Sequence, residues 1–379
     1  MVGVSLAVPN ASPARADFGR YRVYPTGSEP AAAAVADVTG DGRKDVLVTT
    51  TSLDDPPNDF RLFLFRQRQD GTLSSPERFP TFGGSGGYFC EGGLDTGDLE
   101  GDGRTDVVVA MGRGINVYYQ RRGDLRGPSR LRMRRSNGTP LQADWPIGGI
   151  QPAITDVDGD GRNDIVIDHR ISTHPGGIDL LRHTKNGFVQ SRIATNPAGE
   201  IEVADLNRDD SPDVASGVFY SRIRIFMNGG GSSWRTRKLP PRESGIEAAD
   251  VTGDHRADVI YASSFNGHDA VGVFPQLRRG FRRRPHRYPS YEAPGAAEAG
   301  RINSDRLKDV AVLHSDWLRV GIYMQRRSGR LSSERLLAIP SCTSSPDALA
   351  LGDVSGDGRT DIAIACDGWG LVVLRQRGG

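Results

Sequence analysis

The sequence predicts an all-β fold, a seven-bladed β-propeller, from three observations. An acidic loop motif recurs seven times, beginning at residues 37, 98, 156, 205, 250, 301 and 353. The repeats are 45 to 61 residues apart, a period that fits four short strands and their loops in one propeller blade. Short apolar runs, several of them alternating as strands do, flank the loops. A ring of repeats is one folding unit, so we expect residues 17–379 to form a single domain that follows an N-terminal segment, 1–16.

The acidic motif is clearest at Asp156-Val-Asp158-Gly-Asp160-Gly-Arg162-Asn-Asp164, where carboxylates occupy positions 1, 3, 5 and 9. A glycine stands at position 6, where a tight turn needs a positive φ. Ca²⁺ takes about six to eight oxygen ligands, and alternate residues of a turning loop can point inward together, with the position-7 carbonyl as a further donor. Without a cation the four carboxylates would repel one another. The motif therefore predicts calcium binding.

The helix–loop–helix calcium site, or EF-hand, begins with the same pattern and must be excluded. That site needs a bidentate Glu at position 12 and a helix on either side of its loop. Position 12 here is Ile167, inside the alternating run 165–167. The loop therefore leads into a β-strand.

The other six copies keep the motif to different degrees. Those beginning at residues 37, 98 and 353 are close copies, while those beginning at 205 and 250 carry Asp210 and His255 at position 6, residue types that tolerate the left-handed region better than most. The copy Arg301–Asp309 has lost its first carboxylate to Arg301, whose guanidinium can stand in for a cation. We expect six calcium sites and an empty Arg301–Asp309 loop. The expected ligands are Asp37, Thr39, Asp41, Arg43, Asp45, Asp98, Glu100, Asp102, Arg104, Asp106, Asp156, Asp158, Asp160, Arg162, Asp164, Asp205, Asn207, Asp209, Ser211, Asp213, Asp250, Thr252, Asp254, Arg256, Asp258, Asp353, Ser355, Asp357, Arg359 and Asp361.

With these seven motifs, the sequence resembles the FG-GAP/VCBS repeat family. Members are seven-bladed β-propellers found at the head of integrin α subunits and in many secreted bacterial proteins. The resemblance covers almost the whole chain and implies the propeller fold and calcium in the loops. It implies little about function, because the motif that the family shares is structural.

Each repeat reads as four strands with the acidic loop between the first two. The first strand is short and rich in small residues, which suits a crowded position beside the propeller axis; the runs are 33–36, 152–155, 201–204 and 348–351. The second strand alternates strongly, as at 45–48, 106–109, 309–312 and 361–364. The third strands are 62–65, 115–118, 178–181, 223–226, 271–274, 320–323 and 371–374. Turn segments such as 69–71 follow them as hairpin signals.

The two ends of the chain complement each other. The last repeat stops after its third strand, 371–374, while the alternating segment 18–24 belongs to no repeat. We predict that the N-terminal strand near Tyr21 pairs with 371–374 and closes the ring. Closure would remove the exposed sheet edges on which propellers otherwise risk aggregation.

The three cysteines predict one disulfide. Cys342 precedes the first strand of the last repeat and Cys366 ends its second strand, so an antiparallel hairpin would bring both to the same rim. A disulfide fits an exported protein, and Cys90 would be left free. The alternative is a set of three reduced thiols in a cytosolic protein.

The N-terminus also suggests export, and the charge suggests a basic surface. The short apolar run 2–8 precedes Ala14-Arg15-Ala16, which looks like a cleavage site, although the basic part of a signal peptide is missing. We expect a secreted or cell-surface protein, and no stretch is long enough to span a membrane.

The formal net charge is +1, but many carboxylates lie in the loops. With calcium bound, the rest of the surface would be basic and could attract nucleic acid, anionic membranes or acidic polysaccharides; alternatively, the arginines form an ordinary solvated surface.

Ligand binding is expected on the face opposite the acidic loops. All the loops join the first two strands, so they lie on one face, and the unusual residues collect in the loops of the other face. The residues that we expect to bind a ligand are Tyr88, Trp145, His314, Asp316, Trp317 and Trp369. Exposed aromatic rings beside polar groups suit sugars. The alternative is that each ring plugs a loop or the end of the axial channel.

Three functions compete. The first is a binding module for carbohydrate or for a cell-surface glycan or protein. The second is an enzyme, a polysaccharide lyase, in which a His or Tyr abstracts a proton α to a uronate carboxylate neutralised by arginine or a cation; its residues would be His169, Arg170, His174 and Tyr220. The third is a structural scaffold. The sequence contains no Ser-His-Asp motif, phosphate-binding glycine loop, zinc ligand set or nucleic-acid module, and we expect a monomer.

Overall fold

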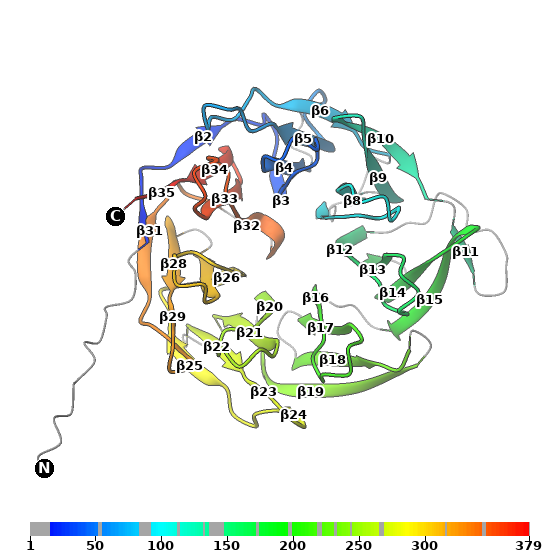
Figure 1. Ribbon diagram of the computed structural model, residues 1–379, viewed down its shortest axis with the longest axis vertical. Coiled ribbons are helices and arrows are strands. Elements are labelled where there is room, and N and C mark those ends of the chain that lie inside the picture. Colours follow the sequence, from blue (N-terminus) through cyan, green and yellow to red (C-terminus); the bar gives the residue numbers. More distant parts are fainter. Residues whose placement is uncertain are drawn as a thin grey trace, which may run out of the picture.

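The computed structural model of this 379-residue chain describes residues 16–51, 55–82, 92–111, 114–131, 133–135, 148–171, 174–195, 199–217, 222–230, 233–242, 245–264, 269–314, 317–342 and 346–378. These residues form seven β-sheets of at least four strands each, arranged as blades around a central axis (Figure 1). The predicted all-β, seven-bladed propeller is confirmed.

Each of the first four blades begins at the axis and runs outward. The first contains β3 (Pro30–Ala36), β4 (Asp45–Thr50), β5 (Arg61–Phe65) and β6 (Glu77–Pro80). The second contains β7 (Gly93–Gly97), β8 (Asp106–Met111), β9 (Gly114–Arg121) and β10 (Asp124–Arg130). The third contains β12 (Gly148–Thr155), β13 (Asp164–Ile171), β14 (His174–Thr184) and β15 (Gly187–Thr195), with β11 (Met133–Arg135) added parallel to β15. The fourth contains β16 (Glu200–Ala204), β17 (Asp213–Gly217), β18 (Arg222–Asn228) and β19 (Trp234–Arg242).

Two of the remaining three blades, the fifth and the sixth, carry a small hairpin at the outer edge. The fifth contains β20 (Gly245–Ala249), β21 (Asp258–Ser263), β22 (Ala270–Phe274) and β25 (His286–Pro289), with the hairpin β23 (Gln276–Leu277) and β24 (Gly280–Phe281). The sixth contains β26 (Pro294–Gly300), β27 (Asp309–His314), β28 (Arg319–Tyr323) and β31 (Arg335–Ala338), with β29 (Gln325–Arg326) and β30 (Arg330–Leu331). The seventh contains β32 (Leu349–Gly352), β33 (Asp361–Cys366), β34 (Gly370–Leu374) and β2 (Arg22–Tyr24).

The apolar core lies between the blades. The second strands β4, β8, β21, β27 and β33 are buried along their whole length. Their side chains alternate between the two sheet faces, so each blade buries one row against each of its neighbours. Val46 and Leu47, for example, belong to two different clusters, one shared with the seventh blade and one shared with the second. This is why the second strands read as continuous apolar runs.

Side-chain amides fasten neighbouring blades on the acidic-loop face. The amide of Gln276 donates to the carbonyl oxygen of Asp205 in the preceding blade at 3.2 Å, and Asn163 donates to that of Asp98 at 2.7 Å. Gln67 of the first blade donates to the carbonyl oxygen of Asp353 in the seventh at 2.8 Å. Each such bond contributes on the order of 1 kcal/mol net, so these contacts fix the angle between blades more than they stabilise the ring.

The N-terminal strand belongs to the blade that is otherwise built from the C-terminal residues. Strand β2 pairs antiparallel with β34, with Arg22 opposite Val373 and Tyr24 opposite Leu371. Strand β1 (Asp17–Phe18) pairs with β35 (Gln376–Arg377) in the same way. Ala16, which the sequence analysis placed in the N-terminal segment, is buried in the core shared by these blades.

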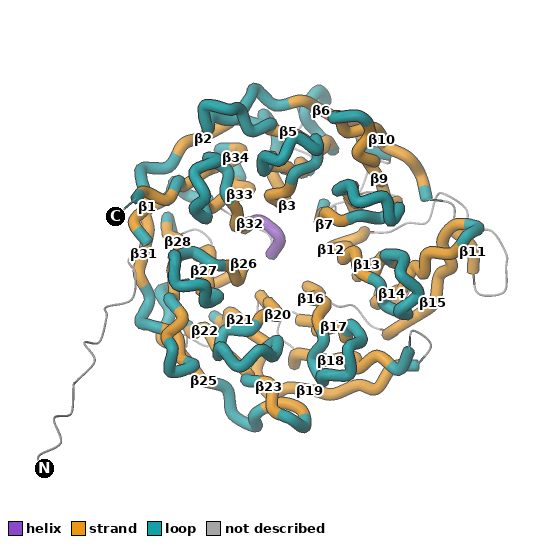
Figure 2. Tube along the Cα trace, viewed as in Figure 1, coloured by secondary structure: helices purple, strands orange, loops and turns teal. Residues whose placement is uncertain are grey.

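The chain enters the seventh blade through a short helical turn. A 3₁₀-helix, η2 (Pro346–Ala348), lies near the axis (Figure 2). Among the described residues it is the only helix. It precedes β32, which therefore starts one residue later than the predicted run 348–351. Cys342, just before this turn, forms the predicted disulfide with Cys366 at the end of β33, with Cα atoms 4.9 Å apart. Cys90 lies outside the described residues.

Candidate functional site

The first aspartate of each acidic loop holds the loop by accepting backbone hydrogen bonds. In the third blade, Asp156 accepts from the amides of Gly159, Asp160 and Gly161 at 2.8, 3.2 and 2.8 Å. The same three positions donate to Asp37, Asp98, Asp205 and Asp250 in their own loops. The chain turns after this aspartate, so that three backbone amides of the turn point back at its carboxylate. These hydrogen bonds explain why the motif forms a compact loop.

The last aspartate of each loop is buried and connects the loop to the sheet. Asp164 is fully buried and accepts from the amides of Val157 and His183 at 3.0 and 2.7 Å. Burial, and secondarily the charges of Asp158 and Asp156, raises the pKa of Asp164 to about 6. Burial likewise raises the pKa of Asp106, Asp213 and Asp258 to about 6. These carboxylates therefore lie in an environment that opposes their negative charge.

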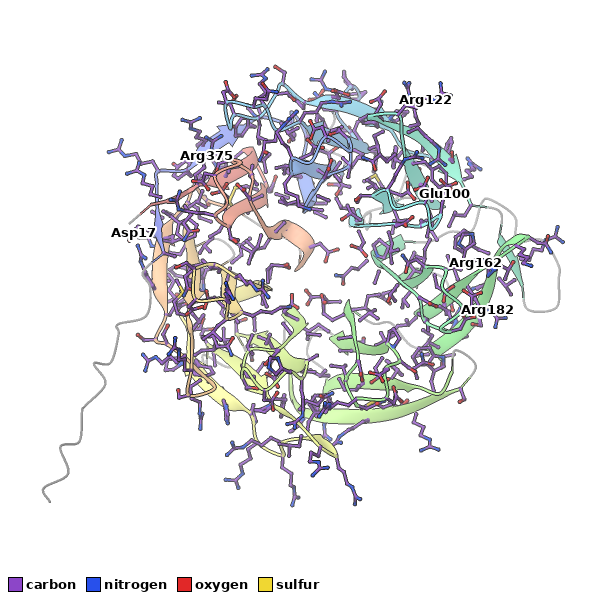
Figure 3. The ribbon with its side chains drawn as sticks, viewed as in Figure 1. Asp17, Glu100, Arg122, Arg162, Arg182 and Arg375 are labelled. Atoms are coloured by element: carbon purple, nitrogen blue, oxygen red, sulfur yellow. A yellow bond between two sulfur atoms is a disulfide. The ribbon has the colours of Figure 1, made fainter. Side chains whose placement is uncertain are left out.

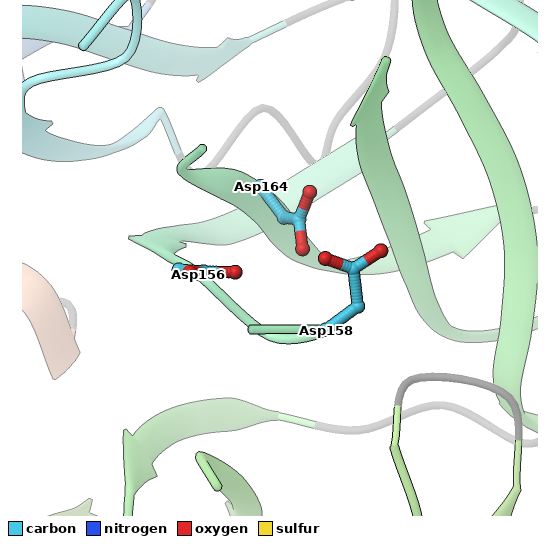
Figure 4. A group of neighbouring side chains, drawn as sticks. All are labelled: Asp156, Asp158 and Asp164. Carbon is cyan, nitrogen blue, oxygen red and sulfur yellow. The ribbon is translucent and has the colours of Figure 1, made fainter. Parts of the chain in front are cut away.

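The donor set in the third blade fits a hard cation. Asp156, Asp158 and Asp164 each offer a carboxylate oxygen, and these oxygens lie within 4.8 Å of one another (Figure 4). Asp160, the fourth predicted carboxylate ligand, instead pairs with Arg162 at 2.7 Å. A cation among three hard oxygen donors would offset their mutual repulsion, and Ca²⁺ suits such a set. The loop can therefore hold calcium with ligands from positions 1, 3 and 9.

The acidic loop of the sixth blade lacks the first carboxylate of the motif, but the arginine in that position does not replace a cation. Arg301 is exposed, and its guanidinium forms no ion pair with a described carboxylate. It therefore does not take the place of a cation, contrary to our expectation. Burial, and secondarily Asp305, raises the pKa of Asp309 to about 7. This loop retains the buried final aspartate without the carboxylate that would begin a metal site.

Two exposed tryptophans occupy equivalent turns on the opposite face. Trp317 is 42% exposed and Trp369 is 46% exposed. The amide of Trp317 donates to the carbonyl oxygen of His314 at 3.3 Å, and that of Trp369 donates to Cys366 at 3.0 Å. Each turn joins the second and third strands of its blade, so antiparallel connection places both on the face away from the acidic loops. The ring of Tyr291 packs edge-on against Trp317, with centroids 6.1 Å apart.

His314, expected at a ligand surface, is instead buried beneath that turn. It has no exposed surface; its Nδ1 lies 2.9 Å from the carbonyl oxygen of Glu292, and its Nε2 lies 2.8 Å from Glu334. Glu334 also accepts from the amide of Tyr291 at 2.6 Å. Both ring nitrogens are thus occupied, so His314 supports the Trp317 turn and cannot itself touch a ligand.

Several predicted residues cannot be placed. Tyr88, Trp145, Asp316 and Tyr220 lie outside the described residues. His169 and Arg170 belong to β13, and His174 begins β14, but their side chains lie outside the described part. The geometry therefore brings together neither the proposed lyase residues nor the complete ligand set.

A group of carboxylates at the axis was not predicted from the sequence. Asp95, Glu202, Glu247 and Glu298 come from four innermost strands, and each stands three residues before its loop begins. Burial raises the pKa of Asp95 to about 6 and of Glu247 to about 7, and raises that of the other two well above the ordinary value. Each of these acids interrupts a strand that otherwise consists mainly of small or apolar residues. This recurring pattern could have identified them from the sequence.

The fold and its loops define the class of protein, a seven-bladed β-propeller built from acidic-loop repeats. The FG-GAP-like repeat family matches residues 37–109 and 98–167. Residues 37–167 are therefore FG-GAP-like repeats, and they form part of a seven-bladed β-propeller. No curated protein matches it by sequence. Among the described residues, no helix combines the length and apolar character that crossing a bilayer requires.

Solved structures resemble the chain at the level of fold. A lectin from Agrocybe aegerita, in a structure concerned with recognition of non-reducing terminal N-acetylglucosamine, has a TM-score of 0.56 and 15% identity over 83% of this chain and 81% of that one. BBS1N in complex with ARL6DN has a TM-score of 0.61 and 13% identity over 95% of this chain and 96% of that one. At such identities the likeness concerns the propeller itself.

Proposed function

We propose that the protein is a calcium-stabilised binding module that acts outside the cell and binds a carbohydrate or a cell-surface partner through the face opposite the acidic loops. The observation that carries this proposal is the pair Trp317 and Trp369, exposed in equivalent turns of neighbouring blades. A tryptophan offers a large apolar face and an N–H donor, and for this reason the residue is enriched at binding surfaces. The disulfide supports an oxidising compartment.

A sugar is the ligand that the chemistry of this face favours. The C–H face of a sugar ring stacks on an aromatic face, and planar polar groups accept its hydroxyls. The turns that carry both tryptophans are held firmly, one by the buried pair His314 and Glu334 and the other by the disulfide at Cys366. Firm support lowers the entropy lost when a ligand binds. The lectin of similar fold is compatible with this role.

Calcium has a structural part in the proposal. The acidic loops connect the first and second strands on the face opposite the tryptophans. Bound ions would stabilise these loops in every blade that retains the first carboxylate. Ions there would not touch a ligand on the tryptophan face. We therefore expect calcium to support the fold without contributing contacts to the ligand.

The test is a panel of neutral and acidic glycans, including glycans ending in N-acetylglucosamine, presented to the protein in calcium. Trp317→Ala and Trp369→Ala are the test variants, and Tyr21→Ala is the control, because Tyr21 is an exposed aromatic residue, at 38%, in the connection between β1 and β2. Saturable binding to one sugar class, lost by about tenfold or more in a folded tryptophan variant but kept in Tyr21→Ala, supports the proposal. Equal binding by all variants would exclude this face, and no binding across the panel would exclude a carbohydrate ligand.

A further inference from the structure

A cavity lies between the acidic loops of the fourth and fifth blades. Its volume is about 550 Å³, within the range of about 300–1,000 Å³ that is usual for small-ligand sites. Six of the residues that line it are Arg208, Asp210, His255, Arg256, Gln276 and Arg278. It belongs to the acidic-loop face and is therefore separate from the tryptophans.

The two loops depart from the repeat where they line this cavity. Arg208, Asp210 and His255 have φ values of 66°, 62° and 62°, whereas the equivalent positions of the third loop are Gly159 and Gly161. A side chain there is strained, by about 1 kcal/mol or more. Glycine would relieve this strain, and the side chains that stand there instead line the cavity.

Two lining side chains hold buried polar atoms without a partner. Gln276 is fully buried; its Nε2 donates to the carbonyl oxygen of Asp205, but its Oε1 has no partner. Arg256 pairs with Asp254 through Nη1 at 2.7 Å, but its buried Nε has no partner. Buried polar atoms in native proteins are nearly always hydrogen-bonded. An acceptor and a donor thus remain for a ligand at the wall of one cavity.

The charge of the cavity favours an anion. Arg208 and Arg278 form no ion pair with any described carboxylate. The carboxylate of Asp205 is already engaged by three amides of its own loop. The guanidinium groups of Arg208 and Arg278 are therefore free to hold an anion, whereas that of Arg256 is paired with Asp254 and the acids of the lining are Asp205 and Asp210. Guanidinium groups match the planar geometry of carboxylate and sulfate groups.

The positive charge continues outward from the cavity along the rim. The hairpin β23–β24, the segment after it and strand β25 carry the exposed residues Arg279, Arg282, Arg283, Arg284 and Arg287, none of which pairs with a described carboxylate. Figure 3 shows nitrogen-tipped side chains projecting from the rim there. Burial, and secondarily the charges of Arg330 and Arg282, lowers the pKa of His286, which shows that the next blade adds to the same positive field.

We propose that this cavity binds an anionic sugar unit of an acidic polysaccharide, whose chain continues over the arginines of the rim. The arginines would hold the carboxylate or sulfate group, while Asp210 and Gln276 Oε1 would accept hydroxyl hydrogen bonds. This mixture of donors and acceptors fits a charged sugar better than a nucleic-acid backbone, and the lining residues include no Phe, Tyr or Trp ring on which a base could stack. The site goes beyond the proposed function because it lies on the other face and has different chemistry.

The experiment measures binding of the full chain, in calcium and about 0.15 M salt, to polygalacturonate and heparin oligosaccharides, which carry carboxylate and sulfate groups respectively. Single-stranded DNA and phosphatidylserine vesicles serve as anionic probes of other classes. The variants are Arg208→Gly, which restores the glycine of the repeat, and Arg278→Ala. The control is Arg122→Ala, because Arg122 follows Gln120 in the second blade as Arg278 follows Gln276 in the fifth.

The expected result is saturable binding of at least one of the two oligosaccharides, weakened about tenfold or more by Arg208→Gly and by Arg278→Ala and unchanged in Arg122→Ala. Arg208→Gly should not lower the thermal midpoint, because it relieves a positive φ; this separates a binding role from a structural one. Equal affinity of the two variants and the wild type would overturn the proposal. DNA or vesicles bound as tightly as the oligosaccharides would also overturn it, in favour of general attraction by charge.

Discussion

Each acidic loop depends on two aspartates with different tasks. The first, as at Asp156, gathers the amides of its own loop, and the last, as at Asp164, joins the loop to the neighbouring strand from a buried position. The raised pKa of Asp164 shows that the site opposes another negative charge. A bound cation would reverse this, because it adds a positive charge next to both carboxylates.

We therefore expect each loop with a complete motif to bind one calcium ion, so that the number of bound ions can be measured. Native mass spectrometry in calcium should find six ions per chain, and a chelator should lower the thermal midpoint, because ions that bind the folded state stabilise it by mass action. Asp158→Ala should remove one ion. Asp305→Ala, the same kind of change in the loop that begins with Arg301, should remove none. An unchanged midpoint in chelator, or no bound ions, would contradict the assignment.

Residue by residue, the sequence predicts conformation better than environment. Asp210 and His255 were expected to tolerate a positive φ in place of glycine, and both adopt one. The cavity beside them was not predicted, because it combines the loop of the fourth repeat with Gln276 and Arg278, which follow the third strand of the fifth. His314 was misjudged for a related reason: its burial depends on Glu334, twenty residues away in an outer strand.

Among the elements, the inner strands were predictable and the outer strands were not. The second and third strands are buried on both faces, so their composition is dictated by packing, and β4 and β5 extend the expected runs 45–48 and 62–65 by one or two residues. The fourth strands face solvent; β6 and β25 alternate between half-buried and exposed positions. Their sequences therefore show little apolar pattern. The parallel strand β11 gave no signal of its own.

The disulfide between the sixth and seventh blades should contribute measurably to stability. Cys342→Ala with Cys366→Ala releases a closed segment of about 25 residues, and loops of this size are worth about 3 kcal/mol in the chain-entropy account. Denaturant unfolding in calcium should show a loss of that order. Reducing agent should give the wild type the same loss and leave the double variant unchanged. A double variant as stable as the oxidised wild type would contradict this expectation.

At the scale of the whole molecule, the axis concentrates negative charge in a narrow space. Burial, followed by the nearby charges of Glu247, Glu200, Glu298 and Asp347, raises the pKa of Glu202 well above its ordinary value. A carboxyl whose pKa is higher in the folded state than in the unfolded chain stabilises the fold while it is protonated. For Glu247 that contribution is complete below the ordinary value of 4.5 and is lost as the pH rises towards about 7.

Neutralising one axial acid should therefore stabilise the protein only where that acid would be charged. Glu202→Gln should raise the thermal midpoint at pH 8 by about 2 °C or more and leave it nearly unchanged at pH 4.5. Glu292→Gln is the control, because Glu292 is exposed and should have little effect at either pH. Thermal unfolding followed by circular dichroism at the two pH values makes the comparison. An equal gain at both pH values would show that the effect is not one of ionisation.

The contact between the first and seventh blades sets this molecule apart from a linear array of repeats. In such an array the terminal units have one neighbour and open first, so exchange of backbone amide hydrogens begins at the ends. Here Gln67 holds the carbonyl of Asp353, and β2 pairs with β34, so the first and last blades each have two neighbours. The backbone amides whose hydrogens exchange most slowly should thus be spread over the second strands of all the blades, rather than confined to the middle of the chain.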